Sequence, residues 1–354
     1  LIKKKTKMKV KRINPSLTSS YDFNLPQELI ANHPVSPADA AKLLIYNRST
    51  NTITHEIFKN IINYLPQNTS IFLNDTKVIK ARIFGKKDTG GKVELLLNKH
   101  LPNNDTYLVY IKGKVHVGTK LYFEQDLEAE VVELVEDDGS RVVKFTQNNN
   151  HIPFQVLIEI LNDIGHIPLP VYINREDEKC DETDYQTLFA KNYGAVAAPT
   201  ASLHFTEELL DELKDKFETN YLTLHVGAGT FKPVDVEDIT KHNMHSEYYD
   251  IPQKTQEALN NNSTKKLAVG TTATRTLEYY TRTKKVSGEC DLFLNPDNQP
   301  QIVDILLTNF HLPKSTLIML VASFVGLEKT LELYEEAIKN EYRFYSYGDA
   351  MLII

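Results

Sequence analysis

The sequence predicts an α/β protein in which a larger α/β domain carries an inserted small antiparallel β-barrel. From residue 69 to 153, short strand-like segments are separated by turn residues, which is typical of a closed barrel. After residue 165, strands alternate with helices, as in an open α/β layer. The first 68 residues lack the barrel pattern. We therefore expect the α/β domain to span 19–68 and 154–354, with the barrel at 69–153 between them.

Residues 1–18 are expected to form a basic disordered tail. Residues 1–12 hold seven basic side chains and no acidic one, although the whole chain has a net charge of −7. The tail is either a solvated extension or a flexible arm attracted to polyphosphate. Because the rest of the chain is acidic, binding of nucleic acid would require a local basic patch there.

Composition limits the class of protein. A chain of 354 residues with 41% hydrophobic residues is large enough for two domains with their own cores. Its two cysteines, Cys180 and Cys290, are too few for a disulfide framework and lack metal-ligand spacing. We therefore expect reduced thiols and a cytoplasmic location. No apolar run reaches the length of a membrane span, so no membrane association is expected.

Five segments of the barrel region have strand character. The segment 127–134 alternates apolar and charged residues, as a strand with one buried face should. Turn signals such as Thr89-Gly90-Gly91 separate the segments. The predicted strands are 70–75, 92–97, 107–113, 127–134 and 141–146.

The α/β region shows helix signals after strands. Thr206 can cap a helix that has Glu207 and Glu208 in its first turn, where acidic side chains favour the helix dipole. Further along, the pattern predicts strands at 221–226, 267–269 and 302–307, and helices at 273–283, 315–325 and 328–339.

Two small-residue turns are candidate ligand sites. The segment 194–208 contains Thr200 and His204, and its small side chains either admit a flat ligand or pack against the sheet. The second turn follows His225, which is either a core histidine or a proton-transfer group. Its backbone N–H groups can approach a ligand closely, and its residues are Gly227, Ala228, Gly229 and Thr230.

A third turn combines a strand end with a helix start. Thr271 and Thr272 follow Gly270, which makes an anion site at the first turn of the next helix. Arg275 is unfavourable there for the helix dipole. Its negative partner is therefore either Glu278, three residues on, or a carboxylate or phosphate of a ligand.

A fourth turn, within 305–319, places polar residues after a buried strand. Asn309, His311 and Lys314 supply a hydrogen-bonding amide, a proton-transfer group and a positive charge. Ser315 can cap the helix that follows.

Three further features lie outside these turns. Glu247, at the start of a predicted strand, can accept hydrogen bonds from a ribose. His242 and His245 have a helical metal-ligand spacing, but no third ligand is evident, so no metal is expected. Arg343 either belongs to a docked terminal strand or lines a pocket.

Segments along almost the whole chain, from Tyr21 to Ile354, resemble the S-adenosylmethionine:tRNA ribosyltransferase-isomerase family of queuosine biosynthesis. Their order and spacing make the resemblance specific. The segments include YDFNLPQELIA, LNDTKVIKARIFGKK, VAAPTASLHFTEELL, TLHVGAGTFKPV, MHSEYYDI, VGTTATRTLE, LLTNFHLPKSTLIMLV and YRFYSYGDAMLI.

The resemblance implies transfer of the ribosyl part of S-adenosylmethionine to 7-aminomethyl-7-deazaguanine at the tRNA wobble position, which gives epoxyqueuosine and releases adenine and methionine. S-adenosylmethionine is then a substrate, and no cofactor or metal is implied. The implied partner is a tRNA carrying a GUN anticodon, bound by a monomer. By chemistry, His204, His225 and His311 are candidate proton-transfer groups.

The chain departs from the family pattern at Ala38, Lys77 and Ser202, where arginine, arginine and glycine are usual. An arginine-to-lysine change loses bidentate hydrogen bonding. Two alternatives therefore remain: a non-catalytic or altered-specificity tRNA-binding paralogue, and a methyltransferase. The methyltransferase is disfavoured because the glycine turn lies in mid-chain, rather than after a first strand that opens a βαβ series.

Overall fold

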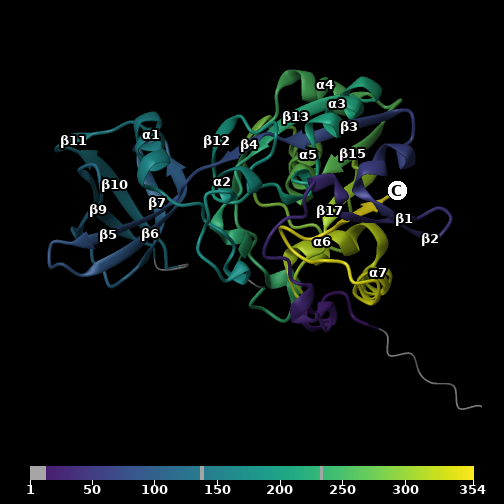
Figure 1. The fold of residues 1–354 in the computed structure, drawn as a ribbon, viewed down its shortest axis with the longest axis horizontal. Coiled ribbons are helices and arrows are strands. Elements are labelled where there is room, and N and C mark those ends of the chain that lie inside the picture. The colour runs from purple at the N-terminus through teal and green to yellow at the C-terminus, as the bar shows by residue number, and fades with distance from the viewer. Residues whose placement is uncertain (1–12, 136–138, 232–233) are drawn as a thin grey trace, which may run out of the picture.

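The computed structural model describes residues 13–135, 139–231 and 234–354, without the side chains of 230 and 231. Figure 1 shows two lobes, a small one built on a barrel and a large one built on a mixed sheet. This confirms the predicted α/β fold with an inserted barrel. Within the described ranges, no helix has both the length and the apolar character needed to cross a membrane.

The large lobe is organised around a nine-stranded mixed sheet. Its spatial order is β16-β14-β13-β3-β15-β17-β18-β1-β2, and β13, β3, β15 and β17 run parallel to one another. The carboxyl ends of these parallel strands therefore lie at one edge. The strands are β1 (Lys42–Asn47), β2 (Thr52–Ile57), β3 (Thr69–Asn74), β13 (Glu218–Leu224), β14 (Glu247–Asp250), β15 (Lys265–Val269), β16 (Ser287–Cys290), β17 (Ile305–Asn309) and β18 (Ala350–Ile353).

Both faces of this sheet are buried. Because side chains alternate along a strand, Leu43 and Ile45 pack on one face, and Leu44 and Tyr46 on the other. The first face is covered by α3 (Glu207–Lys216) and the short helix η4 (Phe58–Tyr64). The second is covered by α4 (Gln253–Asn260), α5 (Thr271–Thr283), α6 (Thr316–Val325) and α7 (Leu327–Lys339).

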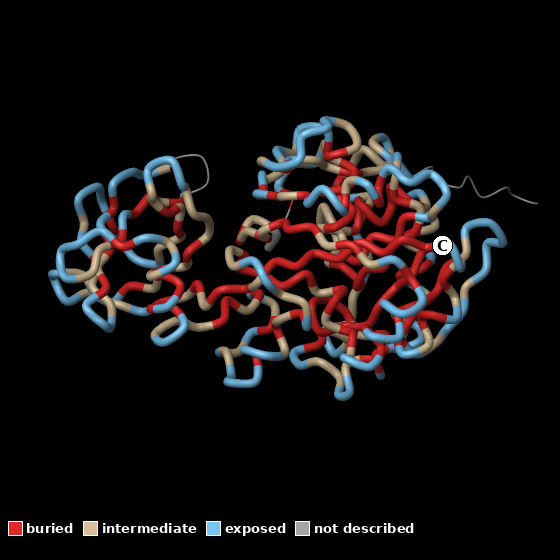
Figure 2. The backbone as a smooth tube through the Cα atoms, turned by 90° about the horizontal axis from the view of Figure 1, so that it is seen from above, coloured by how far each residue is buried: buried red, intermediate tan, exposed pale blue. Residues whose placement is uncertain are grey.

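The small lobe is a six-stranded antiparallel barrel with its own core. Pairing between β9 and β10 closes it, and β11 (Asn150–His151) extends β10. Helix α1 (Phe154–Ile164) packs against the barrel core through Leu157, Ile158 and Leu161. Buried residues occupy both lobes in Figure 2. The barrel strands are β5 (Arg82–Lys87), β6 (Lys92–Leu101), β7 (Thr106–Lys112), β8 (Lys120–Tyr122), β9 (Leu127–Leu134) and β10 (Arg141–Gln147).

Some predicted assignments differ from the structure. The predicted barrel strand 70–75 is β3, at the middle of the large sheet, because its side chains are buried on both faces. The next strand, β4 (Thr76–Val78), pairs with β12 (Asn192–Ala195) in a small separate sheet. Strands β5 and β8 were not predicted. Of the predicted tail, residues 1–12 lie outside the described residues, whereas the Thr18 N–H donates to the Glu237 carbonyl.

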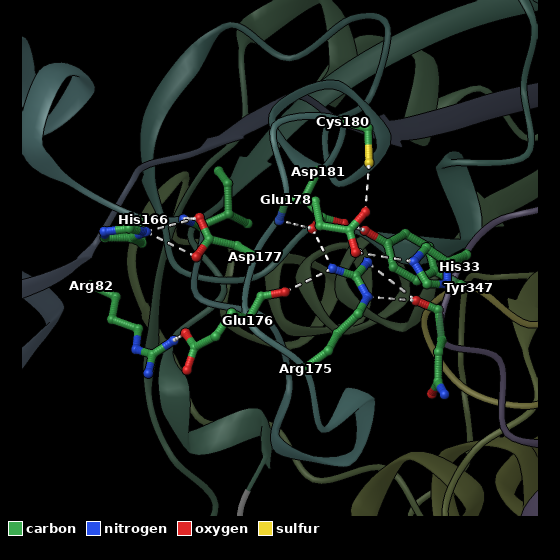
Figure 3. A network of polar contacts seen from close by, with 12 residues as sticks. His33, Arg82, His166, Arg175, Glu176, Asp177, Glu178, Cys180, Asp181 and Tyr347 are labelled. Carbon is green, nitrogen blue, oxygen red and sulfur yellow. Dashed lines mark hydrogen bonds and ion pairs between the residues drawn. The ribbon is translucent and has the colours of Figure 1, made fainter.

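A connector, residues 165–185, leads from the barrel back to the α/β domain and includes α2 (Asp181–Asp184). Figure 3 shows its polar contacts. On the barrel side, Arg82 binds Glu176 at 2.9 Å. On the other side, the Arg175 guanidinium donates to both oxygens of the fully buried Asp181, at 2.6 and 2.8 Å. Tyr347 donates to the same carboxylate. The connector is therefore fixed to both domains.

Asp181 remains ionised in this setting. Burial by itself raises the pKa of its carboxyl, but hydrogen bonds from Arg175, the Glu178 N–H and Tyr347 hold the pKa below its ordinary value. The bidentate Arg175–Asp181 geometry fixes the direction of both side chains. This places the connector's short helix η5 (Val171–Ile173) beside the segment 345–347.

Candidate active site at the carboxyl edge of the sheet

The first cavity lies where β15 and β17 end, and its volume is about 300 Å³. The connector supplies part of its wall through Val171, Tyr172 and Tyr185. Among the described residues that line it, none has a charged side chain. The other lining residues are Ala197, Ala198, Pro199, Thr200, Ala201, Val226, Gly270, Thr271, Thr272, Thr308, Asn309, Phe310, His311, Leu312, Pro313, Ser315, Leu317, Tyr345 and Ser346.

Two helices begin at this cavity. Helix α5 starts at Thr271 directly after Gly270, whose φ of +90° allows the sharp turn from β15. No side-chain hydrogen bond caps α5, so its first N–H groups are available to a ligand beside Thr271 and Thr272. Ser315 caps α6 by accepting a hydrogen bond from the Ile318 N–H. Two positive helix ends therefore face one neutral cavity.

His311 also lines the first cavity. Its Nε2 lies 2.9 Å from the Thr308 hydroxyl, and its backbone N–H donates to the Tyr334 hydroxyl. Burial lowers the pKa of the ring to about 3. The imidazole is therefore neutral at neutral pH and can exchange a proton without carrying a standing charge.

The second cavity, about 900 Å³, lies between the barrel and the α/β domain. Barrel strand β6 contributes Asn98, Lys99 and His100, and the α/β side contributes aromatic rings that include Tyr193 and Tyr248. This cavity thus has charged side chains, Lys99, Glu247 and Glu289, in its lining, in contrast to the first.

His225 and Lys77 contact the aromatic rings of this cavity. The His225 ring lies nearly parallel to that of Tyr248, with centroids 5.9 Å apart. Its Nδ1 is 2.8 Å from the Thr76 hydroxyl, and burial lowers the pKa of the ring to about 4. Lys77 Nζ stands 4.6 Å from the Tyr193 ring centroid, within the range of a cation–π contact.

A small third cavity, of about 20 Å³, lies between these two. It shares Thr271, Thr272 and Leu317 with the first cavity. It shares Gly229, His245 and Glu247 with the second. The three cavities therefore form a series that runs from the start of α5 to the barrel.

Arg275 and Glu247 form a buried ion pair in the wall of the third cavity. Arg275 also donates to the Leu292 carbonyl at 3.0 Å and to the Cys290 carbonyl at 3.1 Å. The sequence offered Glu278 or a ligand as the partner of Arg275; the structure pairs Arg275 with Glu247, so the Glu278 alternative was wrong.

Glu278 is committed elsewhere. Its buried carboxylate accepts hydrogen bonds from the backbone N–H groups of Gln301, Ile302 and Val303. It also pairs with Arg282. Arg275 instead reaches β14, because that strand passes beside the start of α5.

The glycine turn after β13 is held from two sides. The Gly227 N–H donates to Glu247 Oε1 at 2.9 Å, and the Ala228 N–H donates to Asn98 Oδ1 at 2.7 Å. Asn98 lies at a bulge in β6, where the register with β7 shifts between Leu97 and Lys99. A bulge redirects a side chain, and here that side chain crosses to the other domain. The side chain of Thr230 lies outside the described residues.

Four predicted site residues line none of the three cavities: Ala228, which packs in the barrel core, and His204, Lys314 and Arg343. His204 is buried against the Phe58 ring, with centroids 4.9 Å apart. Lys314 is half-exposed and pairs with Asp22 at 2.9 Å. Arg343 is held against Asp349, whose carboxylate also accepts from the Lys42 N–H. Lys314 and Arg343 thus have carboxylate partners, whereas the buried Nε2 of His204 has no hydrogen-bond partner among the described residues.

The two closely spaced histidines both line the third cavity. His245 also lines the second cavity, and His242 packs on the Phe293 ring, with centroids 5.5 Å apart. In the described part of the chain, no three His, Cys, Asp or Glu side chains gather as a metal site.

Sequence reasoning missed Asn98, Tyr172 and Tyr345. The bulge that directs Asn98 has no sequence signal, because it depends on the pairing of β6 with β7. Tyr172 and Tyr345 meet only because the connector folds back on the carboxyl-terminal segment. The aromatic density of 342–351 was the one available hint for Tyr345.

Comparison with known proteins gives a consistent result. A family model described as queuosine biosynthesis protein matches residues 18–353. A relative from Aliarcobacter butzleri is 69% identical over 342 residues, which cover 97% of this chain and 100% of that protein. One from Nitratiruptor is 62% identical over 342 residues, with the same coverage. Both are named S-adenosylmethionine:tRNA ribosyltransferase-isomerase.

A solved structure is also similar. It is the S-adenosylmethionine tRNA ribosyltransferase from Thermotoga maritima, with 35% sequence identity and a TM-score of 0.53. The match covers 94% of this chain and 99% of that one. The resemblance noted from the sequence is confirmed, and the chain belongs to the S-adenosylmethionine:tRNA ribosyltransferase-isomerase family of queuosine biosynthesis.

Proposed function

We propose that this chain transfers and isomerises the ribosyl group of S-adenosylmethionine onto 7-aminomethyl-7-deazaguanine at the wobble position of tRNA. The products are epoxyqueuosine-tRNA, adenine and methionine. The observation that supports this most is the series of three cavities, because the reaction joins a small sulfonium nucleoside to one base of a large RNA. High identity to named transferases over the full length favours this function over a non-catalytic paralogue.

S-adenosylmethionine binds in the first cavity. Its volume falls in the range of small-molecule sites. The uncapped start of α5 at Thr271 and Thr272 suits the methionine carboxylate, because helix N-termini bind anions through backbone N–H groups. Small side chains from Ala197 to Ala201 leave room for a flat adenine.

The wobble base enters the second cavity. RNA bases that leave their stack are commonly held against aromatic side chains, and Tyr193 and Tyr248 line this space. Lys77, against the Tyr193 ring, and Lys99, which pairs with Glu289 at 2.6 Å, can contact the phosphate backbone. The partner is a tRNA with a GUN anticodon.

The reaction takes place where the cavities join. The sulfonium acidifies the adjacent ribose carbon, and a base removes a proton there. The amine of the modified base attacks the sugar as adenine leaves, and cleavage of the carbon–sulfur bond releases methionine. His225 and His311 stand on either side of the junction and are neutral at neutral pH, so each can accept that proton. Arg275 and Glu247 act as positioning residues for the turn at Gly227.

The remaining parts of the proposal concern context. S-adenosylmethionine is consumed as a substrate, and no cofactor takes part. The protein acts in the cytoplasm as a monomer.

The test is a product assay. The protein is incubated with S-adenosylmethionine and tRNA bearing the aminomethyl base, and the small molecules are separated by chromatography. Release of adenine and methionine in equal amounts is expected. S-adenosylhomocysteine would instead identify a methyltransferase, and retention of tRNA without turnover would identify a binding protein.

A further inference from the structure

We propose that Tyr172 and Tyr345 recognise the positive sulfur of the substrate by their ring faces and so select the sulfonium over its neutral thioether. This rests on the proposed function, which places S-adenosylmethionine in the first cavity. It adds the side chains that bind the positively charged sulfonium, whose charge the reaction requires.

The cavity requires such a group. A cation moved from water into a buried site without compensation is strongly disfavoured. The side chains that line the first cavity, within the described ranges, are all uncharged. The two helix ends there are positive and therefore suit the carboxylate, not the sulfonium. Aromatic faces are a strong source of negative potential at this wall, because their quadrupole attracts cations.

The two rings are held together at the cavity wall. Their centroids are 4.4 Å apart, with 51° between the ring planes. The Tyr172 hydroxyl bonds the Ser346 hydroxyl and accepts from the Ser346 N–H at 3.2 Å, which fixes its ring. Burial raises the pKa of both Tyr172 and Tyr345 to about 12, so both are neutral phenols that offer a π face and no full charge.

The backbone at Tyr345 supports a functional role. Its φ is +74°, in the left-handed region that bulky residues avoid. Such a conformation persists only where surrounding contacts enforce it, and it is concentrated at functional sites. Here the Tyr345 N–H donates to the Phe310 carbonyl, and its own carbonyl accepts from Asn309.

The connector holds the other half of the pair. Tyr172 lies in η5, just before the Arg175–Asp181 clasp of Figure 3, and Tyr347 donates to the same Asp181 carboxylate. The clasp thus joins the segments that carry Tyr172 and Tyr345. The buried Tyr185 hydroxyl, close to Ser346 and the Ala198 backbone, also lines the cavity and can accept from the methionine ammonium.

The experiment compares S-adenosylmethionine with S-adenosylhomocysteine, which lacks the positive charge. Dissociation constants are measured by calorimetry on the full chain for the wild type, Tyr172→Leu and Tyr345→Leu. A desolvated cation–π contact predicts that each leucine variant weakens S-adenosylmethionine binding about 10-fold and leaves S-adenosylhomocysteine binding unchanged.

Three variants serve as controls. Tyr172→Phe and Tyr345→Phe keep the ring face and are expected to preserve the preference for the charged ligand, which separates the π face from the hydroxyl. Tyr122→Leu removes a barrel tyrosine on β8, outside the three cavities, and is expected to bind both ligands as the wild type does. Thermal unfolding midpoints show that each variant is folded.

The outcomes separate this inference from the proposed function. An equal loss of affinity for both ligands in the leucine variants would place the nucleoside in the first cavity but overturn recognition of the charge. Unchanged affinity for both ligands in both Tyr172→Leu and Tyr345→Leu would overturn the placement itself, and with it this inference.

Discussion

The buried Arg275–Glu247 pair gives the sharpest quantitative prediction. Both side chains are about 5% exposed. Arg275→Met leaves the Glu247 carboxylate without its counter-ion, and Glu247→Gln does the same to the guanidinium. Removing one partner of a buried pair costs about 3–5 kcal/mol of unfolding free energy. We expect each single variant to lose stability in that range.

The double variant tests the reason for this loss. With Arg275→Met and Glu247→Gln together, no buried charge is left unpaired, and the glutamine oxygen can still accept from the Gly227 N–H. The loss should therefore be smaller than the sum of the two single losses by about 1–3 kcal/mol. Urea unfolding followed by circular dichroism measures all three, since the chain has no tryptophan to report by fluorescence.

A surface pair provides the matched control. Lys216 and Glu212 lie 2.7 Å apart on α3, with each side chain more than half exposed. Lys216→Met is expected to change the unfolding free energy by less than about 0.5 kcal/mol. Single losses at Arg275 and Glu247 as small as this, or losses that simply add in the double variant, would refute the buried-pair reasoning.

Two further predictions concern the glycine turn and a cavity histidine. Asn98→Ala removes the acceptor of the Ala228 N–H, so steady-state kinetics should show a kcat/KM for tRNA modification about 10-fold lower. Asn98→Asp keeps an acceptor and should restore most of the lost kcat/KM. Equal rates in the wild type and both variants would contradict this role of Asn98. Because burial lowers the His311 pKa from 6.5 to about 3, the unfolded state binds a proton below pH 6.5 that the folded state refuses. The contribution of a neutral His311 to stability is therefore fully present above that pH and falls toward pH 3. The urea midpoint of His311→Asn should fall less steeply than that of the wild type between about pH 7 and pH 5. Parallel curves for the two proteins would contradict this role of His311.

Sequence patterns correctly predicted the strands and helix caps that depend only on neighbouring residues in the chain. The segment 127–134 alternates in sequence and does so in the barrel, with Leu127, Ala129 and Val131 inward. Thr206 and Ser315 cap helices as expected, because a cap needs only its own next turn. Strand β3 was placed in the wrong domain because a fully apolar strand does not reveal which sheet buries it.

Long-range pairings limited the prediction of the site. Gly227, Thr271 and His311 follow or open elements at the carboxyl edge of the parallel strands, which is where such folds place ligands, so they could be identified. Lys314 and Arg343 were chosen for their charge alone, and the structure gives each a carboxylate partner. The partner of Arg275 lies 28 residues away, on a strand whose neighbour no local pattern indicates.

The barrel also bears on how the polypeptide reaches its native state. Where the barrel begins and ends, the Arg82 N–H donates to the His166 carbonyl, and the His166 N–H donates back at 2.8 Å. A barrel that forms early therefore closes most of the long loop between β4 and β12. Closing that loop first lowers the entropic cost of pairing those strands by about 1 kcal/mol. The inserted barrel thus favours the pairing of the strands on either side of it. Mutations that slow formation of the barrel should therefore also delay completion of the large sheet.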